Sequence, residues 1–164
     1  MSSRPKLQRC TLNLVDYNAK LFDLSSLADV VHLNELSLHF DDMEELNINC
    51  VWNTVQKIQE FQGFKNLHIV TIECYRVRDM TWLIFAPNLK AITLNWCKSL
   101  EEVISKEKLD EVVSEKKENL NPFSKLQSLE ILGAERLKSI YWKALLSPRL
   151  KKIDVMKCPN LLVF

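Results

Sequence analysis

The stretch "PNLKAITLNWCKSLEEVI", residues 87–104, decides the fold because its apolar residues follow a fixed spacing. These positions are Leu89, Ile92, Leu94, Cys97, Leu100, Val103 and Ile104. The central LxL triplet has the period of two of a β-strand, so its leucine-type side chains point to one side and the intervening residues to the other. One such unit cannot bury its own apolar side. The spacing therefore predicts several stacked units whose strands form a parallel sheet.

The same spacing recurs along the chain. "LKKIDVMKCPNL" at residues 150–161 repeats it without a gap, and "LQSLEILGAERL" at 126–137 repeats it with Ala134 in place of the cysteine. In "LHIVTIEC" at 67–74 the cysteine comes one residue early, so one residue is missing from that turn. "LNELSL" at 33–38 and, less completely, "LQRCTL" at 7–12 extend the series. We count about six repeat units.

The cysteine or alanine after each strand falls where the chain bends back and only a small side chain fits. A thiol there also offers a weak S–H donor to the carbonyls of the turn, so we expect Cys74, Cys97 and Cys158 to be structural. The chain has five cysteines, which are widely spaced and form no CxxC pair. This pattern fits neither a disulfide scaffold nor a zinc site and predicts reduced thiols.

Length and composition narrow the class of protein. The 164 residues suit one domain, 1–164, and the chain is 47% hydrophobic and 26% charged with a net charge of +1. These values favour neither general disorder nor a basic nucleic-acid binder. No apolar run approaches the roughly 20 residues of a membrane span, and the start "MSSRPKLQRC" has no apolar signal region. We expect a cytoplasmic chain that binds no nucleic acid and spans no membrane.

Two long segments interrupt the repeats. Leu67 and Leu89 are 22 positions apart, but Leu89 and Leu126 are 37 apart, because of a charged insertion at 105–121. A solvated loop is the simpler expectation for it. Leu109, Val112 and Val113 have helical spacing and allow a short amphipathic helix instead, and a partner-contacting loop is the functional alternative. Residues 43–64 form the second long segment, which includes an extra strand-like "LNI".

A repeat domain acts through the strand residues that its core does not use. We predict that these outward residues form adjacent columns on a concave face and bind a protein. They are Glu35, Ser37, His39, Ile69, Thr71, Glu73, Ala91, Thr93, Asn95, Ser128, Glu130, Leu132, Lys152, Asp154 and Met156. Their mixture of acids, hydroxyls and apolar groups suits protein recognition better than phosphate binding. Ile69, Leu132 and Met156 could anchor a partner, or the face could pack against a neighbouring domain.

The other conspicuous side chains suggest packing. We expect Trp82 and Trp142 to cover the core, with each N–H bonded to a carbonyl or water, whereas Trp96 and Trp52 could be exposed. His32, His39 and His68 lack the spacing of metal ligands, and His39 suits a surface contact. No GxSxG, HExxH or glycine-rich phosphate loop occurs. We therefore expect no enzyme, no catalytic residue, no metal and no cofactor.

Longer strings of sequence carry a family resemblance. "DMTWLIFAPNLKAITLNWCKSLEEVIS" at 79–105 and "NPFSKLQSLEILGAERLKSIYWKALLSPRLKKIDVMKCPNL" at 121–161 resemble the C-terminal leucine-rich repeats of plant intracellular immune receptors. These receptors are the coiled-coil, nucleotide-binding, leucine-rich-repeat (NLR) class. "SSLADVVHLNELSL" and "DMEELNI" extend the likeness upstream. The chain departs from the class in lacking a GxxxxGK[ST] phosphate loop, in reading "GAER" at 133–136 where leucine-proline is usual, and in displacing a proline to Pro148.

The resemblance implies a function and its partners. Such repeats recognise a pathogen effector or a guarded host protein and help to keep the receptor's nucleotide-binding domain inactive, in the cytoplasm or peripherally at the plasma membrane. A free-standing adapter or decoy is the main alternative. A ubiquitin-ligase substrate receptor would need an F-box-like segment, and a small-molecule receptor would need pocket chemistry that the sequence does not reveal.

We therefore expect an α/β leucine-rich-repeat solenoid with a parallel sheet on its concave side and irregular loops and short helical turns outside. The ending "NLLVF" lacks an evident polar cap, which suggests a fragment, an end covered by a partner, or self-association through the last repeat.

Overall fold

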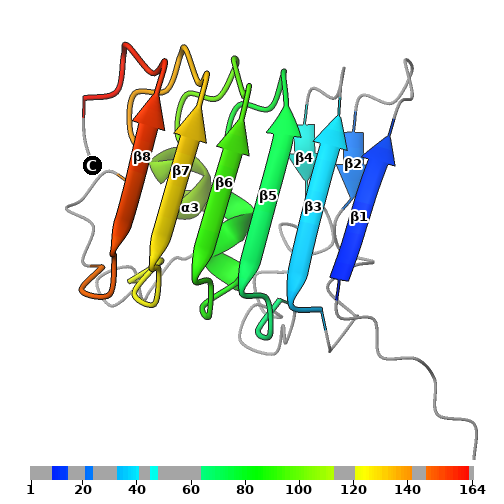
Figure 1. The fold of residues 1–164 in the computed structure, drawn as a ribbon. Helices are drawn as coiled ribbons and strands as arrows, with labels where there is room; N and C mark the ends of the chain where they lie inside the picture. Colours follow the sequence, from blue (N-terminus) through cyan, green and yellow to red (C-terminus); the bar gives the residue numbers. More distant parts are fainter. Residues whose placement is uncertain are drawn as a thin grey trace, which may run out of the picture.

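Six strands lie side by side in one parallel sheet in this computed structural model, which describes residues 9–14, 21–23, 33–40, 45–47, 64–112, 121–141 and 147–162 (Figure 1). In spatial order they are β1 (Arg9–Leu14), β3 (Glu35–Phe40), β5 (Ile69–Cys74), β6 (Ala91–Asn95), β7 (Ser128–Leu132) and β8 (Lys152–Met156). A separate two-stranded parallel sheet pairs β2 (Leu21–Asp23) with β4 (Glu45–Asn47), the second of which overlaps the predicted extra strand. The architecture confirms the predicted α/β leucine-rich-repeat solenoid.

The ladder of apolar side chains forms the core. Ile72 pairs with Leu94, Leu94 with Ile131, and Ile131 with Val155, so equivalent positions stack from strand to strand. Between β3 and β7 the inward residues are at most 1% exposed. Even the incomplete first repeat joins in register, with Cys10 opposite Leu36. The alternation predicted from the LxL triplets is therefore confirmed from β3 to β7.

Backbone hydrogen bonds also stack the turns that precede the strands. The amide of Lys90 donates to the carbonyl of His68 at 2.8 Å, that of Gln127 to Lys90 at 2.8 Å, and that of Lys151 to Gln127 at 2.9 Å. Equivalent bonds join the segments that follow the turns after the strands, which we call the return side of the coil. There the amides of Glu101, Lys138 and Leu162 donate to the carbonyls of Arg78, Glu101 and Lys138, each at 2.9 Å. Each repeat thus satisfies the polar groups of its neighbour, which keeps the repeats in a constant register.

The turns after β6, β7 and β8 each contain a residue with left-handed backbone. Each lies two positions after the second inward residue of its strand, which is Leu94, Ile131 or Val155. These left-handed residues are Trp96 (φ 54°), Gly133 (φ 72°) and Lys157 (φ 55°). The small residue follows next, and the thiol of Cys97 donates to the carbonyl of Asn95 at 3.5 Å. In β5 the left-handed residue is absent and Cys74 continues the strand, which accounts for the early cysteine.

These contacts support a structural role for the three cysteines. Cys74 and Cys97 are buried, Cys158 is half-buried, and all are free thiols. Burial raises the pKa of Cys97 to about 12, which keeps this thiol protonated near neutral pH. The Cys158 thiol donates to the carbonyl of Met156 at 3.3 Å, as expected for a weak S–H donor in the turn.

The first part of the charged insertion is helical. α3 (Lys106–Val112) begins after Ser105, whose hydroxyl accepts the amide of Lys108 at 3.5 Å and whose own amide donates to the Thr81 hydroxyl at 2.9 Å. Leu109 is 1% exposed and holds the helix to the body of the protein. The short-helix alternative is therefore confirmed for residues 106–112, and the solvated-loop expectation is wrong there. Residues 113–120 lie outside the described part of the chain.

Trp82 packs as predicted, but without a partner for its N–H. It stands in the 3₁₀-helix η2 (Thr81–Phe85), is 2% exposed, and lies against Phe64 with ring centroids 5.4 Å apart. The described residues offer its Nε1–H no hydrogen-bond acceptor. Trp142 and Trp52 lie outside the described residues. In contrast, Trp96 is 38% exposed.

The last strand leaves ladder positions uncovered. Ile153 is 53% exposed, whereas its register partner Leu129 is 1% exposed. Leu162, which follows the last described turn, is 83% exposed. Among the described residues, the apolar side of β8 is therefore less covered than that of β7, although Val155 still packs against the core.

Candidate functional site

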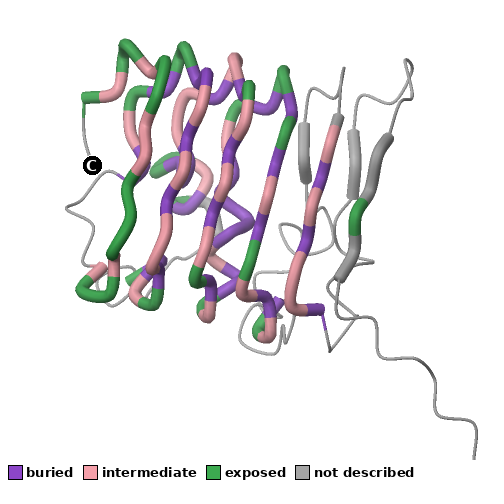
Figure 2. Tube along the Cα trace, in the orientation of Figure 1, coloured by how far each residue is buried: buried purple, intermediate pink, exposed green. Residues whose placement is uncertain are grey.

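The fifteen outward residues predicted from the sequence form three columns across β3, β5, β6, β7 and β8. The first column is Glu35, Ile69, Ala91, Ser128 and Lys152; the middle one is Ser37, Thr71, Thr93, Glu130 and Asp154; the third is His39, Glu73, Asn95, Leu132 and Met156. All fifteen are half-buried or exposed (Figure 2). We call this surface the open face. Its arrangement follows the predicted columns, and its role in binding remains a prediction.

Register extends the open face onto β1. Arg9, Thr11 and Asn13 pair with the first-, middle- and third-column residues of β3. The face predicted from the sequence excludes these three residues, because the first repeat matches the leucine spacing least completely. The recurrence of "TLNL" at 11–14, close to "ITLN" at 92–95, was the available signal.

The open face carries more negative than positive charge. Its fifteen residues include four carboxylates, one lysine and one histidine. The Lys152 ammonium lies 2.8 Å from the Glu130 carboxylate, and this hydrogen bond is the main cause that lowers the pKa of Glu130. His39 Nδ1 lies 3.4 Å from Glu73 Oε2. Carboxylates outnumber ammonium groups among the fifteen residues, which gives the open face an acidic character.

The three expected apolar anchors do not form one group. Leu132 and Met156 are register partners on β7 and β8, and Met156 is 51% exposed. Ile69, 40% exposed, belongs to the first column on β5 and so lies at the other end of its strand, away from that pair. The pair alone offers a compact apolar contact.

Beside this pair, the turns after the strands add an aromatic surface. The Trp96 ring lies so close to Gly133 that a Cβ on this glycine would come within 2.5 Å of Trp96 Cε3. The ammonium of Lys157 lies 5.1 Å from the centroid of the same ring, a cation–π arrangement. Because Gly133 and Lys157 directly follow Leu132 and Met156, the Trp96 ring and the Lys157 ammonium lie at the same edge of the sheet as the apolar pair.

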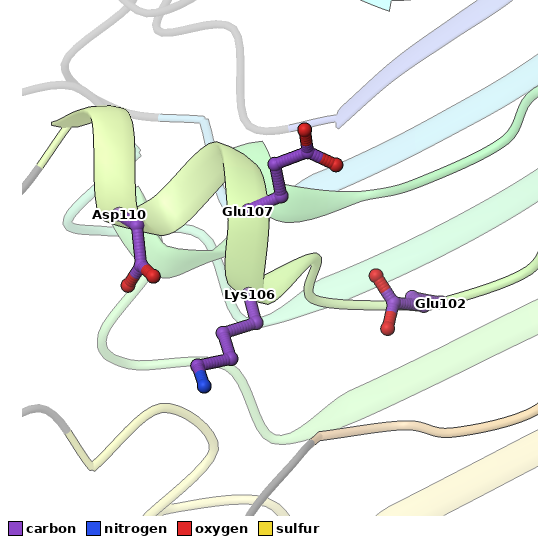
Figure 3. Close-up of a pocket in the computed structure, with 4 residues that line it drawn as sticks. All are labelled: Glu102, Lys106, Glu107 and Asp110. Carbon is purple, nitrogen blue, oxygen red and sulfur yellow. The ribbon is translucent and has the colours of Figure 1, made fainter.

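The charged hollow beside α3 has a different character. It is lined by Glu102, Lys106, Glu107 and Asp110, and the side chains of Glu107 and Asp110 point away from each other (Figure 3). Among the described residues, no group of three histidine, cysteine or acidic side chains could hold a metal ion. This hollow offers no convergent set of ligands.

The histidines are accounted for in other ways. His39 faces Glu73 on the open face, and its contact with a partner remains a prediction. Burial, followed by the charges of Lys90 and Lys125, lowers the pKa of His68 and favours its neutral form. His32 lies outside the described residues. Within the described ranges, no helix is both long enough and apolar enough to cross a membrane.

No protein-family model matches the chain. The sequence is 33% identical over 156 residues to a probable disease resistance protein of Arabidopsis thaliana. This alignment covers 92% of this chain and 16% of the relative. It is 33% identical to the Arabidopsis disease resistance protein UNI over 87% of this chain, and 42% identical to the disease resistance protein RPS5 over 60% of it. The chain thus spans about a sixth or less of these relatives' lengths (16%, 16% and 11%).

Among solved structures, an internalin (inlF) from Listeria monocytogenes is similar with a TM-score of 0.31 and 15% identity over 88% of this chain and 59% of that protein. The assignment of the fold therefore rests on strand order and register in this chain.

Proposed function

The chain is a homologue of plant disease resistance proteins of the NLR class, and from this premise we propose that it is a protein-recognition domain that acts by binding, without catalysis. Its ligand is a pathogen effector or a host protein that an effector modifies, met in the cytoplasm. In a full-length receptor the same repeats contact the nucleotide-binding domain and help to hold it inactive until the ligand arrives.

The open face is the observation that carries this proposal. A core built only from inward positions leaves three columns of outward side chains whose identity the fold does not constrain. These columns combine acids, hydroxyls and amides with the apolar pair Leu132 and Met156 and the nearby Trp96. Aromatic and apolar groups beside polar ones are typical of protein interfaces, in which a few large side chains supply most of the binding energy.

The test is a pull-down from plant extract with the parent chain and the variant Thr71→Arg/Thr93→Arg/Glu130→Arg. These three residues are successive register partners in the middle column, so the arginines would stand about 5 Å apart at the centre of the open face. Like charges so placed repel one another and a basic partner. We expect the variant to fold, by circular dichroism, and to lose the partner.

The matched control is Glu107→Arg/Asp110→Arg, which changes the net charge by the same amount. Both residues are exposed on α3, which Figure 1 draws behind the sheet. The control should retain the partner. If the middle-column variant also retained it, or if both variants lost it equally, the open face would not be the recognition surface.

A further inference from the structure

The turns that precede β5, β6, β7 and β8 form a second charged surface, distinct from the open face. The described residues of these turns are 64–68, 86–90, 121–127 and 147–151, which contain five cations and no aspartate or glutamate. The cations are Lys65, Lys90, Lys125, Arg149 and Lys151, and all five are exposed. We call this surface the basic edge. It runs along the lower ends of the strands in Figure 1.

Backbone stacking brings these cations together although they are far apart in sequence. Lys90 and Lys151 stand one position after their ladder leucines, while Lys125 and Arg149 stand one position before theirs. The hydrogen bonds that join His68, Lys90, Gln127 and Lys151 fix these turns side by side. Successive strands are about 4.8 Å apart, so the four turns place the cations in a row about 15 Å long.

One cation of the row is held in position by a neighbouring repeat. The Lys125 ammonium donates to Asn88 Oδ1, and the Asn88 amide donates in turn to the carbonyl of Lys65 at 2.6 Å. The influence of the Lys90 and Lys125 charges on His68 shows that they act on the same short stretch of surface. The edge is therefore partly ordered before any ligand arrives, which lowers the entropic cost of binding.

The pattern of charge elsewhere makes this edge unusual within the protein. On the return side, neighbouring repeats place opposite charges together: Lys98 with Glu135 at 3.4 Å and Lys138 with Glu101 at 2.9 Å. At the basic edge Lys90, Lys125 and Lys151 lie on adjacent turns, and like charges on neighbouring strands cost folding free energy. An anionic partner would remove that repulsion.

We propose that the basic edge is a docking surface for an acidic, extended segment of a partner protein. Along a row about 15 Å long, an extended peptide places about three carboxylates on one side, because its alternate residues are about 7 Å apart. The long lysine and arginine side chains can reach across the difference between this spacing and the roughly 4.8 Å spacing of the turns. The two aromatic residues of these turns, Phe64 and Phe123, are 4% and 3% exposed and so cannot stack on the bases of a single-stranded nucleic acid. A broad polyanion such as a membrane or a duplex would also meet the carboxylates of the adjacent open face.

The experiment measures fluorescence anisotropy of a labelled decaglutamate peptide with the parent chain and with Lys90→Glu/Lys125→Glu/Lys151→Glu. We expect the parent to bind, more weakly as salt is raised, and the variant to lose about tenfold or more in affinity. Because the three lysines are exposed and of like charge, the variant should remain folded by circular dichroism.

The control variant Lys106→Glu/Arg136→Glu/Lys157→Glu makes the same change in net charge at exposed positions away from the edge. It should bind decaglutamate within about twofold of the parent. No binding by the parent, or equal losses in both variants, would overturn the proposal. So would tighter, edge-dependent binding of an oligothymidylate or of phosphatidylserine vesicles, because the partner would then be a nucleic acid or a membrane.

Discussion

Gly133→Ala should destabilise the protein far more than a typical surface substitution. The backbone of Gly133 has a φ of 72°, where a residue with a Cβ costs about 1 kcal/mol or more. That Cβ would also lie 2.5 Å from Trp96 Cε3, so the indole must move. Displacing a packed ring adds about 1–2 kcal/mol. We expect a total of about 2–3 kcal/mol, or about 5–10 °C in Tm for a domain of this size.

A double-mutant cycle with Trp96→Ala separates the two causes. Urea unfolding followed by circular dichroism would give the free energy of each variant. Without the indole, Gly133→Ala should cost only the backbone contribution of about 1 kcal/mol. Lys157→Ala is the control, because Lys157 already has a Cβ at the equivalent left-handed position. A neutral Gly133→Ala, or an equal cost with and without Trp96, would refute the reasoning.

Three further predictions concern the core, a thiol and an ion pair. In urea unfolding, Leu129→Ala should lower the free energy of unfolding by about 2–5 kcal/mol and Ile153→Ala by under about 1 kcal/mol. The reason is that these register partners are 1% and 53% exposed. Similar losses in the two variants would contradict the exposure of Ile153 on β8. Cys97, with its pKa raised to about 12, should resist iodoacetamide near neutral pH until the protein is denatured, and modification of the native protein would contradict this. The hydrogen bond from Lys152 lowers the pKa of Glu130 in the folded protein. The pair therefore stabilises the fold at pH values above the ordinary carboxyl pKa of 4.5, and this contribution is lost as the pH falls through the lower pKa of the folded state. In an NMR titration Lys152→Ala should raise the pKa of Glu130, and an unchanged pKa would disprove the coupling.

The sheet was predictable from sequence because one short pattern encodes both sides of each strand. The leucine spacing around Leu94 determines which residues point inward, and the same alternation assigns Thr93 and Asn95 to the open face. Register then follows because a slip of one residue would expose the whole ladder. The inward and outward sets therefore agree with the structure in β3 to β7, where local pattern and tertiary burial favour the same arrangement.

Features that depend on contacts between repeats were not predictable in the same way. The charged composition of residues 105–121 favoured a loop over the short helix that the spacing of Leu109 and Val112 also allowed. Contacts decide for the helix at 106–112, because Ser105 is held by Thr81 of the preceding repeat and Leu109 is buried. Likewise, tryptophan has no preference for left-handed backbone, and Trp96 adopts it because its turn is fixed between neighbouring ones.

The basic edge is a surface that becomes visible only once the fold is known. Lys90, Lys125 and Lys151 follow one another at intervals of 35 and 26 residues, and no charge run or motif connects them. A parallel solenoid converts those long intervals into adjacency, because each repeat returns the chain to the same edge. A search for local clusters of basic residues therefore misses this surface, whereas alignment of the repeats on their ladder leucines reveals it.

The open face and the basic edge carry charge of opposite sign, and they meet where the strands begin. Lys152 begins β8 on the open face and directly follows Lys151 of the basic edge, yet it pairs with the Glu130 carboxylate across the sheet. This ion pair lies at the boundary between an acidic face and a basic row. A partner that contacts both surfaces must therefore present basic groups to one and acidic groups to the other. A uniformly charged ligand would be attracted by one surface and repelled by the other, so its net binding free energy would be small. This arrangement therefore selects for a partner with a matching pattern of charge.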